Sequence, residues 1–317
     1  MHKAMPIGVE DFCELRKGYY FVDKTRFIRQ LLDEHSKVTL LTRPRRFGKT
    51  LTMSMLDWFF SIDKADKSRE LFVGLDIERA GASYMGACGQ YPVVFLTFKD
   101  TNGLSWEMMQ GLFSSYISML FLRYTYLLDS PRVQDPLKKR FQQIVEMEAD
   151  EARLSAALAL LMEMLRQHYG RQVILLIDEY DAPVQQAWEN GFYRECIAFL
   201  KQLLGSALKS NDNLAFAVLT GVLRVAKESI FSYDRPIPAA AVDASTFAIE
   251  DYGMTLREQD LTQGTSPGAL KRVYVNDVPD TIASPSGCTI RRRCDFLCQI
   301  ALACGMRPMN CWTASDV

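Results

Sequence analysis

Three consecutive residues of the types needed to hold a phosphate, Gly48, Lys49 and Thr50, stand between an apolar run and a helix-forming run. Loop amides and the positive end of a helix dipole favour a bound phosphate at such a junction. Lys49 would reach the β- and γ-phosphates of a nucleoside triphosphate, and the Thr50 hydroxyl would bind magnesium. A full phosphate-binding loop has glycine at the position of Arg43. The evidence for a phosphate site therefore depends on the placement of Gly48, Lys49 and Thr50 between a strand and a helix. The nucleotide contacts that we expect are Arg45, Arg46, Phe47, Gly48, Lys49, Thr50 and Leu51.

A second apolar run ends in two carboxylates, Asp178 and Glu179. The run, 173–177, is apolar throughout, which is typical of a strand at the centre of a parallel sheet covered on both faces. Acids at the carboxyl end of such a strand lie where open α/β sheets bind ligands. We therefore predict that Asp178 is the magnesium partner and that Glu179 polarises the attacking water. Taken alone, the run fits equally well a buried strand that ends in a solvated acidic turn.

A third apolar run, 214–219, ends at the hydroxyl of Thr220. In the additional-strand class of P-loop ATPases, a polar residue at such a strand end senses the γ-phosphate, and Thr220 is our candidate. A threonine that makes a turn hydrogen bond at a strand end is an equally good interpretation. Arg224 and Lys227 follow, and they either stabilise charge on the γ-phosphate, in the same or a neighbouring subunit, or are surface cations.

These residues need parallel strands to bring them together. Apolar runs predict strands at 38–42, 92–98, 173–178 and 214–221, and helical periodicity predicts helices at 24–34, 49–61, 105–128, 135–148, 152–168 and 191–208. Right-handed crossovers convert this alternation into a parallel sheet with helices on both faces. The predicted fold is therefore α/β: a three-layer P-loop NTPase sandwich of the additional-strand class, in which the helices over 105–168 form an insertion.

The composition is that of an ordinary soluble protein, with 48% hydrophobic and 24% charged residues. Because 37 Lys and Arg face 38 Asp and Glu, the net charge does not indicate nucleic acid or an anionic membrane as a partner. The chain start lacks the apolar core of a signal peptide, and the most apolar long stretch, 112–122, is too short to span a bilayer. We therefore predict a cytoplasmic protein. Five cysteines crowd into 288–311 without a Cys-x-x-Cys pair or a nearby histidine, which argues against zinc.

Several sequence blocks occur in a fixed order along residues 6–232. They are Ile7-Gly8 with Asp11-Phe12, Tyr20-Phe-Val-Asp-Lys-Thr25, Leu41-Thr-Arg-Pro-Arg-Arg-Phe-Gly-Lys-Thr50, Ile177-Asp-Glu-Tyr-Asp-Ala-Pro183 and Leu219-Thr-Gly-Val-Leu-Arg-Val-Ala-Lys-Glu-Ser-Ile-Phe-Ser232. Together the blocks resemble the prokaryotic AAA-ATPase-like family, in which arginine at the position of Arg43 is normal. The resemblance implies ATP and Mg²⁺ as cofactors. It also implies that the Walker A residues Lys49 and Thr50 and the Walker B residues Asp178 and Glu179 carry the chemistry.

The resemblance ends at Ser232, where the composition also changes. Family members continue with a further strand and a C-terminal nuclease-like domain of the PD-(D/E)xK kind, whereas residues 233–317 are turn-rich with little apolar periodicity. We therefore predict an AAA-ATPase-like P-loop domain over 1–232 and an unassigned tail over 233–317, with a frameshift, a chimeric origin or partial disorder as the hypotheses. Such a nuclease needs an acid two residues before its lysine, and no lysine in this sequence has one, so nuclease activity is not expected.

Two functions stay open on the sequence. The first is Mg²⁺-dependent ATP hydrolysis coupled to a conformational change, with Glu179, Lys49, Thr220 and Arg224 as catalytic residues. The second is a nucleotide-gated switch with little or no turnover, in which the helices over 105–168 contact a protein partner. AAA-type enzymes often form rings, so an oligomer is compatible with either. Asp181 also has two interpretations, orienting a magnesium-bound water or capping the helix that follows, and we favour the cap.

Overall fold

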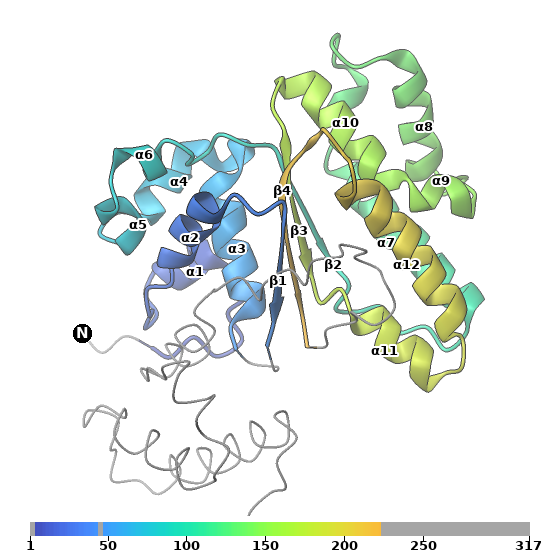
Figure 1. The fold of residues 1–317 in the computed structure, drawn as a ribbon, viewed down its shortest axis with the longest axis horizontal. Coiled ribbons are helices and arrows are strands. Elements are labelled where there is room, and N and C mark those ends of the chain that lie inside the picture. Colours follow the sequence, from blue (N-terminus) through green and yellow to red (C-terminus); the bar gives the residue numbers. More distant parts are fainter. Residues whose placement is uncertain (1–3, 44–46, 223–317) are drawn as a thin grey trace, which may run out of the picture. The chain divides into compact units, whose positions relative to one another are not determined.

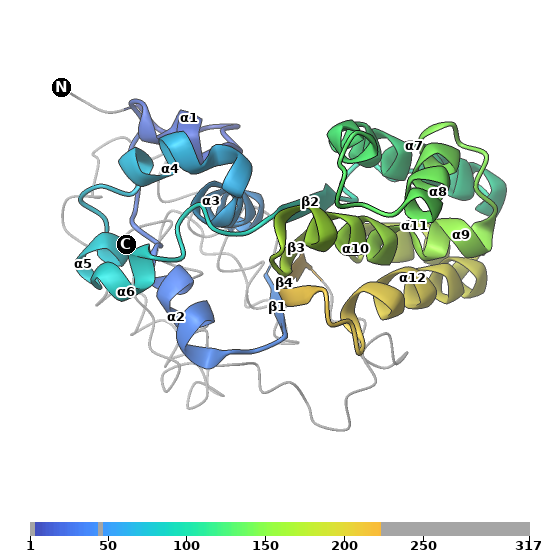
Figure 2. The same cartoon turned by 90° about the horizontal axis from the view of Figure 1, so that it is seen from above.

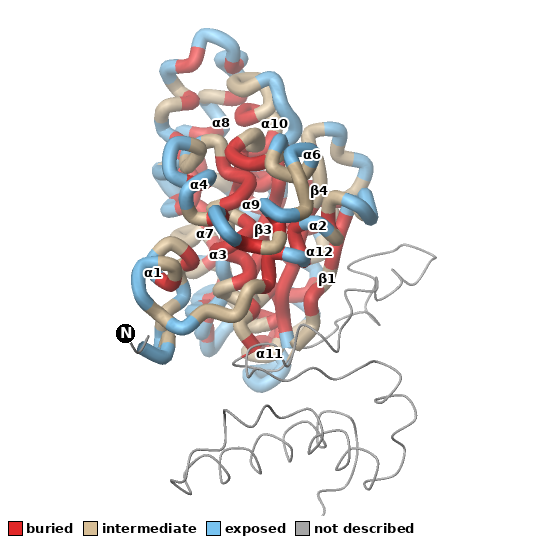
Figure 3. The backbone as a smooth tube through the Cα atoms, turned by 90° about the vertical axis from the view of Figure 1, so that its left-hand side faces the viewer, coloured by how far each residue is buried: buried red, intermediate tan, exposed pale blue. Residues whose placement is uncertain are grey.

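Four parallel strands form one sheet in the part of the chain described by the computed structural model, which is residues 4–43 and 47–222. The strands are β1 (Val38–Thr42), β2 (Val93–Thr97), β3 (Val173–Asp178) and β4 (Leu214–Gly221). They lie in the order β1-β4-β3-β2, and each neighbouring pair is parallel. Every residue of β3 is buried, as expected for a strand covered on both faces (Figure 3).

Helices cover both faces of this sheet (Figure 1, Figure 2). On one face lie α1 (Phe12–Arg16), α2 (Arg26–Glu34), α3 (Lys49–Phe60), η1 (Ile62–Lys64), α4 (Ala65–Leu71), α5 (Asp76–Arg79) and α6 (Ala82–Met85). On the other lie α7 (Trp106–Leu122), η2 (Thr125–Leu128), α8 (Asp135–Val145), α9 (Glu151–Ser155), α10 (Ala157–Tyr169), α11 (Ala182–Glu189) and α12 (Tyr193–Leu208). The described residues therefore form three layers.

The four predicted strands are confirmed, with ends shifted by at most one residue. Two predicted helices are wrong in their extent. The helix predicted over 105–128 ends at Leu122 and continues as the short 3₁₀ helix η2. The helix predicted over 152–168 is two helices, because at Ala156 the backbone leaves the α region and its amide bonds to the carbonyl of Arg153, three residues back.

The helices over 105–168 share one core with the sheet. Buried side chains of α7, α8 and α10 belong to the same apolar cluster as those of β2, β3, β4 and α12. Phe113 of α7 shows how the layers join: its ring stacks on Phe199 of α12 with centroids 4.9 Å apart and meets Phe98, next to β2, edge-on at 5.7 Å. This packing fixes the helical layer against the strands that carry the predicted site.

Replacing Phe113 with alanine should lower the free energy of unfolding by about 3–5 kcal/mol, because the ring is fully buried and its loss leaves a cavity between two layers. Urea unfolding followed by circular dichroism measures this change. Met119→Ala is the matched control, since Met119 lies on the same helix with 59% of its surface exposed. Its expected effect is within about 0.5 kcal/mol. Equal losses in the two variants would contradict this account of the core.

No helix in the described residues has both the length and the apolar character needed to cross a membrane. Residues 233–317, with the five clustered cysteines, lie outside the described residues.

Candidate functional site

Those predicted site residues that the structure describes lie at the carboxyl ends of β1, β3 and β4, at the lower end of the sheet in Figure 1. Strand register brings them side by side. Leu41 of β1 pairs with Thr220 of β4, and Ile177 of β3 pairs with Leu219. Asp178 and Thr220, the next residues on β3 and β4, are therefore neighbours. These pairings are possible because β4 lies between β1 and β3 in the sheet.

Asp178 is the centre of the site. Its side chain is fully buried, and it accepts hydrogen bonds from two hydroxyls that come from different elements. Thr50 of α3 donates to Oδ2 at 2.7 Å, and Thr220 of β4 donates to Oδ1. The structure thus brings together three residues that the sequence places up to 170 positions apart. Two donors offset part of the cost of burying this carboxylate.

The start of α3 has the geometry of a phosphate-binding junction. Gly48 is its N-cap with φ of 71°, a left-handed conformation that glycine adopts without strain. Lys49 is 8% exposed, and its Nζ donates to the carbonyl of Arg43 at 3.1 Å, across the loop. Phe47 is buried and Leu51 is half-buried, whereas the predicted contacts Arg45 and Arg46 lie outside the described residues.

Arg43 occupies the position of the first glycine in a full phosphate-binding motif. It directly follows β1 and makes hydrogen bonds to the ends of β1 and β4. Its Nη1 donates to the carbonyl of Thr42 at 2.7 Å, and its backbone amide donates to the carbonyl of Gly221 at 3.0 Å. Burial lowers the pKa of its guanidinium, which is nevertheless a strong enough base to remain charged. Arg43 therefore links the start of the loop to the end of β4.

Glu179 has a conformation that is rare for a residue with a side chain. Its φ is 52°, and its amide donates to Oγ1 of Thr220 at 3.3 Å. A left-handed backbone at a non-glycine residue costs free energy, and functional sites are among the places where such residues cluster. The bond to Thr220 helps to hold it. Thr220 thus accepts a hydrogen bond from the turn after β3 and donates one to Asp178, and its role as a sensor of the γ-phosphate stays a prediction.

Asp181 does not cap the next helix with its side chain, so the interpretation that we favoured is wrong. It occupies the N-cap position of α11, but its backbone is already helical, with φ of −92° and ψ of −10°. A capping residue is normally extended, which directs its side chain at the helix amides. The Asp181 carboxylate instead accepts from the amide of Val222 at 3.0 Å and from Nε2 of Gln185 at 3.2 Å.

Comparison with known proteins settles the family. A family profile with the description "Predicted AAA-ATPase" matches residues 6–231, a span that contains every helix and strand given above. The chain belongs to the AAA-ATPase-like family. Membership in this family supports ATP binding. No solved structure matches the chain.

One curated relative in this comparison is an uncharacterized protein in the vnfD 5′ region of Azotobacter chroococcum mcd 1, which is 27% identical over 259 residues. The alignment covers 80% of this chain and 44% of the relative, so the chain spans less than half of the relative's length. An alignment that covers 80% of the chain extends past Ser232, whereas the family match ends at 231. The division of the chain at Ser232 therefore stays a prediction.

The residues present fit the magnesium ion that this family implies. Thr50 Oγ1 and an Asp178 carboxylate oxygen meet at 2.7 Å, and hydroxyl and carboxylate oxygens are the ligands that Mg²⁺ prefers. In the described residues, no group of three or more His, Cys, Asp and Glu side chains is placed to hold a metal. The pair therefore suits an ion that takes its other ligands from water and phosphate, as Mg²⁺ commonly does.

Lys99 is a charged neighbour of the site that we did not single out in the sequence. It follows β2 and forms an ion pair with Glu10, which raises the pKa of its amine, and the nearby Glu179 carboxylate acts in the same direction. The sequence signal for it was the one that pointed to Asp178: a charged residue directly past a strand of a parallel sheet. Arg224 and Lys227, the other predicted cations, lie outside the described residues.

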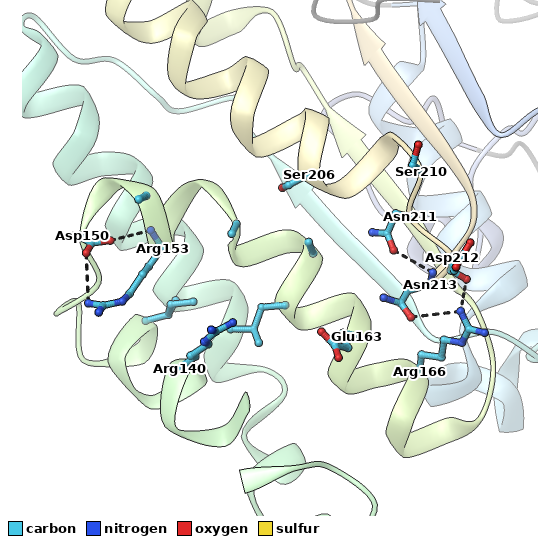
Figure 4. Close-up of a pocket in the computed structure, with 15 residues that line it drawn as sticks. Arg140, Asp150, Arg153, Glu163, Arg166, Ser206, Ser210, Asn211, Asp212 and Asn213 are labelled. Atoms are coloured by element: carbon cyan, nitrogen blue, oxygen red, sulfur yellow. Dashed lines mark hydrogen bonds and ion pairs between the residues drawn. The ribbon is translucent and has the colours of Figure 1, made fainter. Parts of the chain in front are cut away.

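An open hollow of about 930 Å³ lies near the amino ends of the strands, beside Asn213 and the start of β4 (Figure 4). Among the predicted site residues within 4–43 and 47–222, none lines this hollow. Its charged side chains are balanced, because the three arginines Arg140, Arg153 and Arg166 face three acids, Asp150, Glu163 and Asp212. Arg153 is paired with Asp150 at 3.4 Å, and Arg166 donates to the carbonyl of Asp212. This hollow lacks the excess of positive charge that a triphosphate requires.

Proposed function

We propose that this chain binds ATP together with magnesium and hydrolyses it at the carboxyl ends of β1, β3 and β4. The observation that carries the proposal is the convergence of Thr50 and Thr220 on the buried carboxylate of Asp178. One hydroxyl comes from the phosphate-binding helix and the other from the strand that would sense the γ-phosphate. Family membership supports the same activity.

The strand order supports the additional-strand class of P-loop folds. β4 lies between β1, which leads into the phosphate loop, and β3, which carries the acids. This position gives Thr220 a place between the loop and Asp178. In this interpretation the helices over 105–168 are an insertion between β2 and β3 that has become part of the main core.

Each site residue then has one role. Lys49 would turn from the Arg43 carbonyl to the β- and γ-phosphates and compensate their charge. Thr50 and Asp178 would hold magnesium, which supplies further charge compensation when bound. Glu179 would accept a proton from the attacking water, and the Thr220 hydroxyl would contact the γ-phosphate and so sense its presence. We propose that Arg224 adds positive charge in the transition state and that turnover is coupled to a conformational change.

The test is phosphate release from ATP as a function of magnesium concentration, comparing Thr50→Ala with wild type. We expect the magnesium concentration for half-maximal rate to rise at least about tenfold, the size of loss seen when a group that supports a metal site is removed. Thr50→Ser is the matched control because it retains the hydroxyl, and it should stay within about threefold of wild type. A magnesium dependence equal in all three proteins would contradict the proposal.

A second candidate function, a nucleotide-gated switch with little turnover, is favoured by the exposed face of α7. Met108, Met119 and Leu122 are each at least half exposed. They lie close to one face, because spacings of 11 and 14 residues are near whole helical turns. Exposed apolar side chains grouped in this way support contact with a protein partner through the helices over 105–168. A cytoplasmic location and assembly into an oligomer stay predictions.

A further inference from the structure

The peptide group that joins Gly221 to Val222 is held from both sides. Its carbonyl accepts from the amide of Arg43 at 3.0 Å, and its N–H donates to Oδ2 of Asp181 at 3.0 Å. Arg43 begins the phosphate-binding loop, and Asp181 ends the turn that carries Glu179. A single peptide group at the end of β4 therefore connects the two halves of the site.

Gly221 is required here for space. A Cβ at this position would lie 2.5 Å from Oδ1 of Asp181 and 2.8 Å from Cε1 of Tyr180. Both neighbours are almost fully buried, with 2% exposure for Asp181 and none for Tyr180, so neither can move aside into solvent. The side chains of Tyr180 and Asp181, in the turn after β3, thus pack directly on the backbone of β4 at Gly221.

Further bonds align the turn with β4. The amide of Glu179 donates to Oγ1 of Thr220 at 3.3 Å, and the amide of Tyr180 donates to the Thr220 carbonyl at 3.0 Å. Asp181 extends this series with a side chain, because its carboxylate reaches the next peptide along the strand. Hydrogen bonds from a backbone amide to a buried carboxylate are among the stronger ones in proteins.

We propose that Asp181 is a positioning residue that fixes the 221–222 peptide, so that the phosphate-binding loop and the turn bearing Glu179 keep a constant relation. This proposal rests on the function proposed above. Asp181 acts through the backbone of β4. Its removal should therefore misplace Glu179 and Thr220 with respect to the phosphates while leaving the groups that bind ATP in place.

Two measurements on the full chain test the proposal with the variants Asp181→Ala and Asp181→Asn. The first is hydrogen exchange of the Val222 amide, resolved with overlapping peptides. The second is steady-state phosphate release from ATP with magnesium. In Asp181→Ala the amide should exchange at least about tenfold faster, because a bond to a charged acceptor is lost. The kcat should fall about 10- to 100-fold with KM changed less than about threefold, as expected for misplaced catalytic groups.

The conservative variant and a neighbour serve as controls. Asp181→Asn keeps an acceptor oxygen, so both the exchange rate and kcat should return to within about fivefold of wild type. Gln185→Ala removes a different hydrogen bond to the Asp181 carboxylate and leaves the bond to Val222, so it should behave as wild type. A loss of activity that Asn does not restore, or that Gln185→Ala shares, would overturn the proposal.

Gly221→Ala provides a second route to the same contact if Asp181→Ala does not fold. Its methyl group must displace the Asp181 carboxylate, so the Val222 amide should exchange faster and kcat should fall although Asp181 is still present. Wild-type exchange in a folded Asp181→Ala or Gly221→Ala protein overturns the positioning role, and so does fast exchange with unchanged kcat. A wild type without Lys49-dependent phosphate release overturns the proposed hydrolysis instead, and the exchange rates still decide the role of Asp181.

Discussion

Replacing Lys49 with alanine is expected to reduce phosphate release from ATP about 10²- to 10³-fold, the range seen when a group that stabilises transition-state charge is removed. The Lys49 amine is almost buried and donates to a carbonyl of the loop. A cation held in this way is partly desolvated already, so its interaction with a triphosphate costs little further desolvation. ATP binding should weaken as well, by about ten- to a hundredfold, since a charge-assisted hydrogen bond is lost.

Lys37→Ala is the matched control for this variant. Lys37 immediately precedes β1, and its Nζ also donates to backbone carbonyls, those of Leu214 at 2.9 Å and Ala215 at 3.2 Å. It lies at the amino end of the strands, away from the predicted site. The two substitutions thus remove the same kind of contact at opposite ends of one sheet. A Lys49→Ala protein that binds and hydrolyses ATP like Lys37→Ala would contradict nucleotide binding at this loop.

Replacing Glu179 with glutamine is expected to slow hydrolysis about 10²- to 10⁴-fold, the usual contribution of a positioned general base, with ATP binding retained. The glutamine keeps the size of the side chain. The hydrogen bond from the backbone amide of residue 179 to Oγ1 of Thr220 does not depend on the carboxylate. The variant should therefore trap bound ATP. Single-turnover phosphate release and equilibrium binding of radiolabelled ATP measure the two effects separately.

Glu163→Gln carries the same chemical change at a distance from the site. Glu163 lies on α10 and lines the hollow near the amino ends of the strands (Figure 4). The Glu163→Gln protein should hydrolyse ATP at the wild-type rate. The comparison also separates the two candidate functions. If Glu179→Gln alters neither the retention of bound ATP nor the rate of phosphate release, the result would favour the nucleotide-gated switch.

Much of the fold could be predicted from local sequence patterns. The four strands were found because each is a short apolar run, and β3 stands out because both of its faces are buried. The strand ends then indicated Asp178 and Thr220 without knowledge of the strand order. Short helices such as α5 and α6, with four residues each, were not predicted, because so few residues cannot show a helical period.

Contacts of the site that depend on tertiary structure were not accessible in this way. The sequence pattern around Asp181 is that of a helix cap, and the alternative contact with Val222 exists because β4 lies beside β3. The need for glycine at 221 arises from the same close approach. Lys99 was overlooked although it follows a predicted strand, because its ion-pair partner Glu10 is 89 residues away in the chain.

The left-handed backbone of Glu179 places stability and chemistry in competition at one position. A non-glycine residue in this conformation costs about 1–2 kcal/mol, and glycine or asparagine would relieve part of that cost. Directed evolution for thermal stability alone would therefore tend to replace Glu179 and to select more stable proteins that cannot activate water. Under the proposed function, glutamate at this position provides for turnover at the expense of a fraction of the folding free energy.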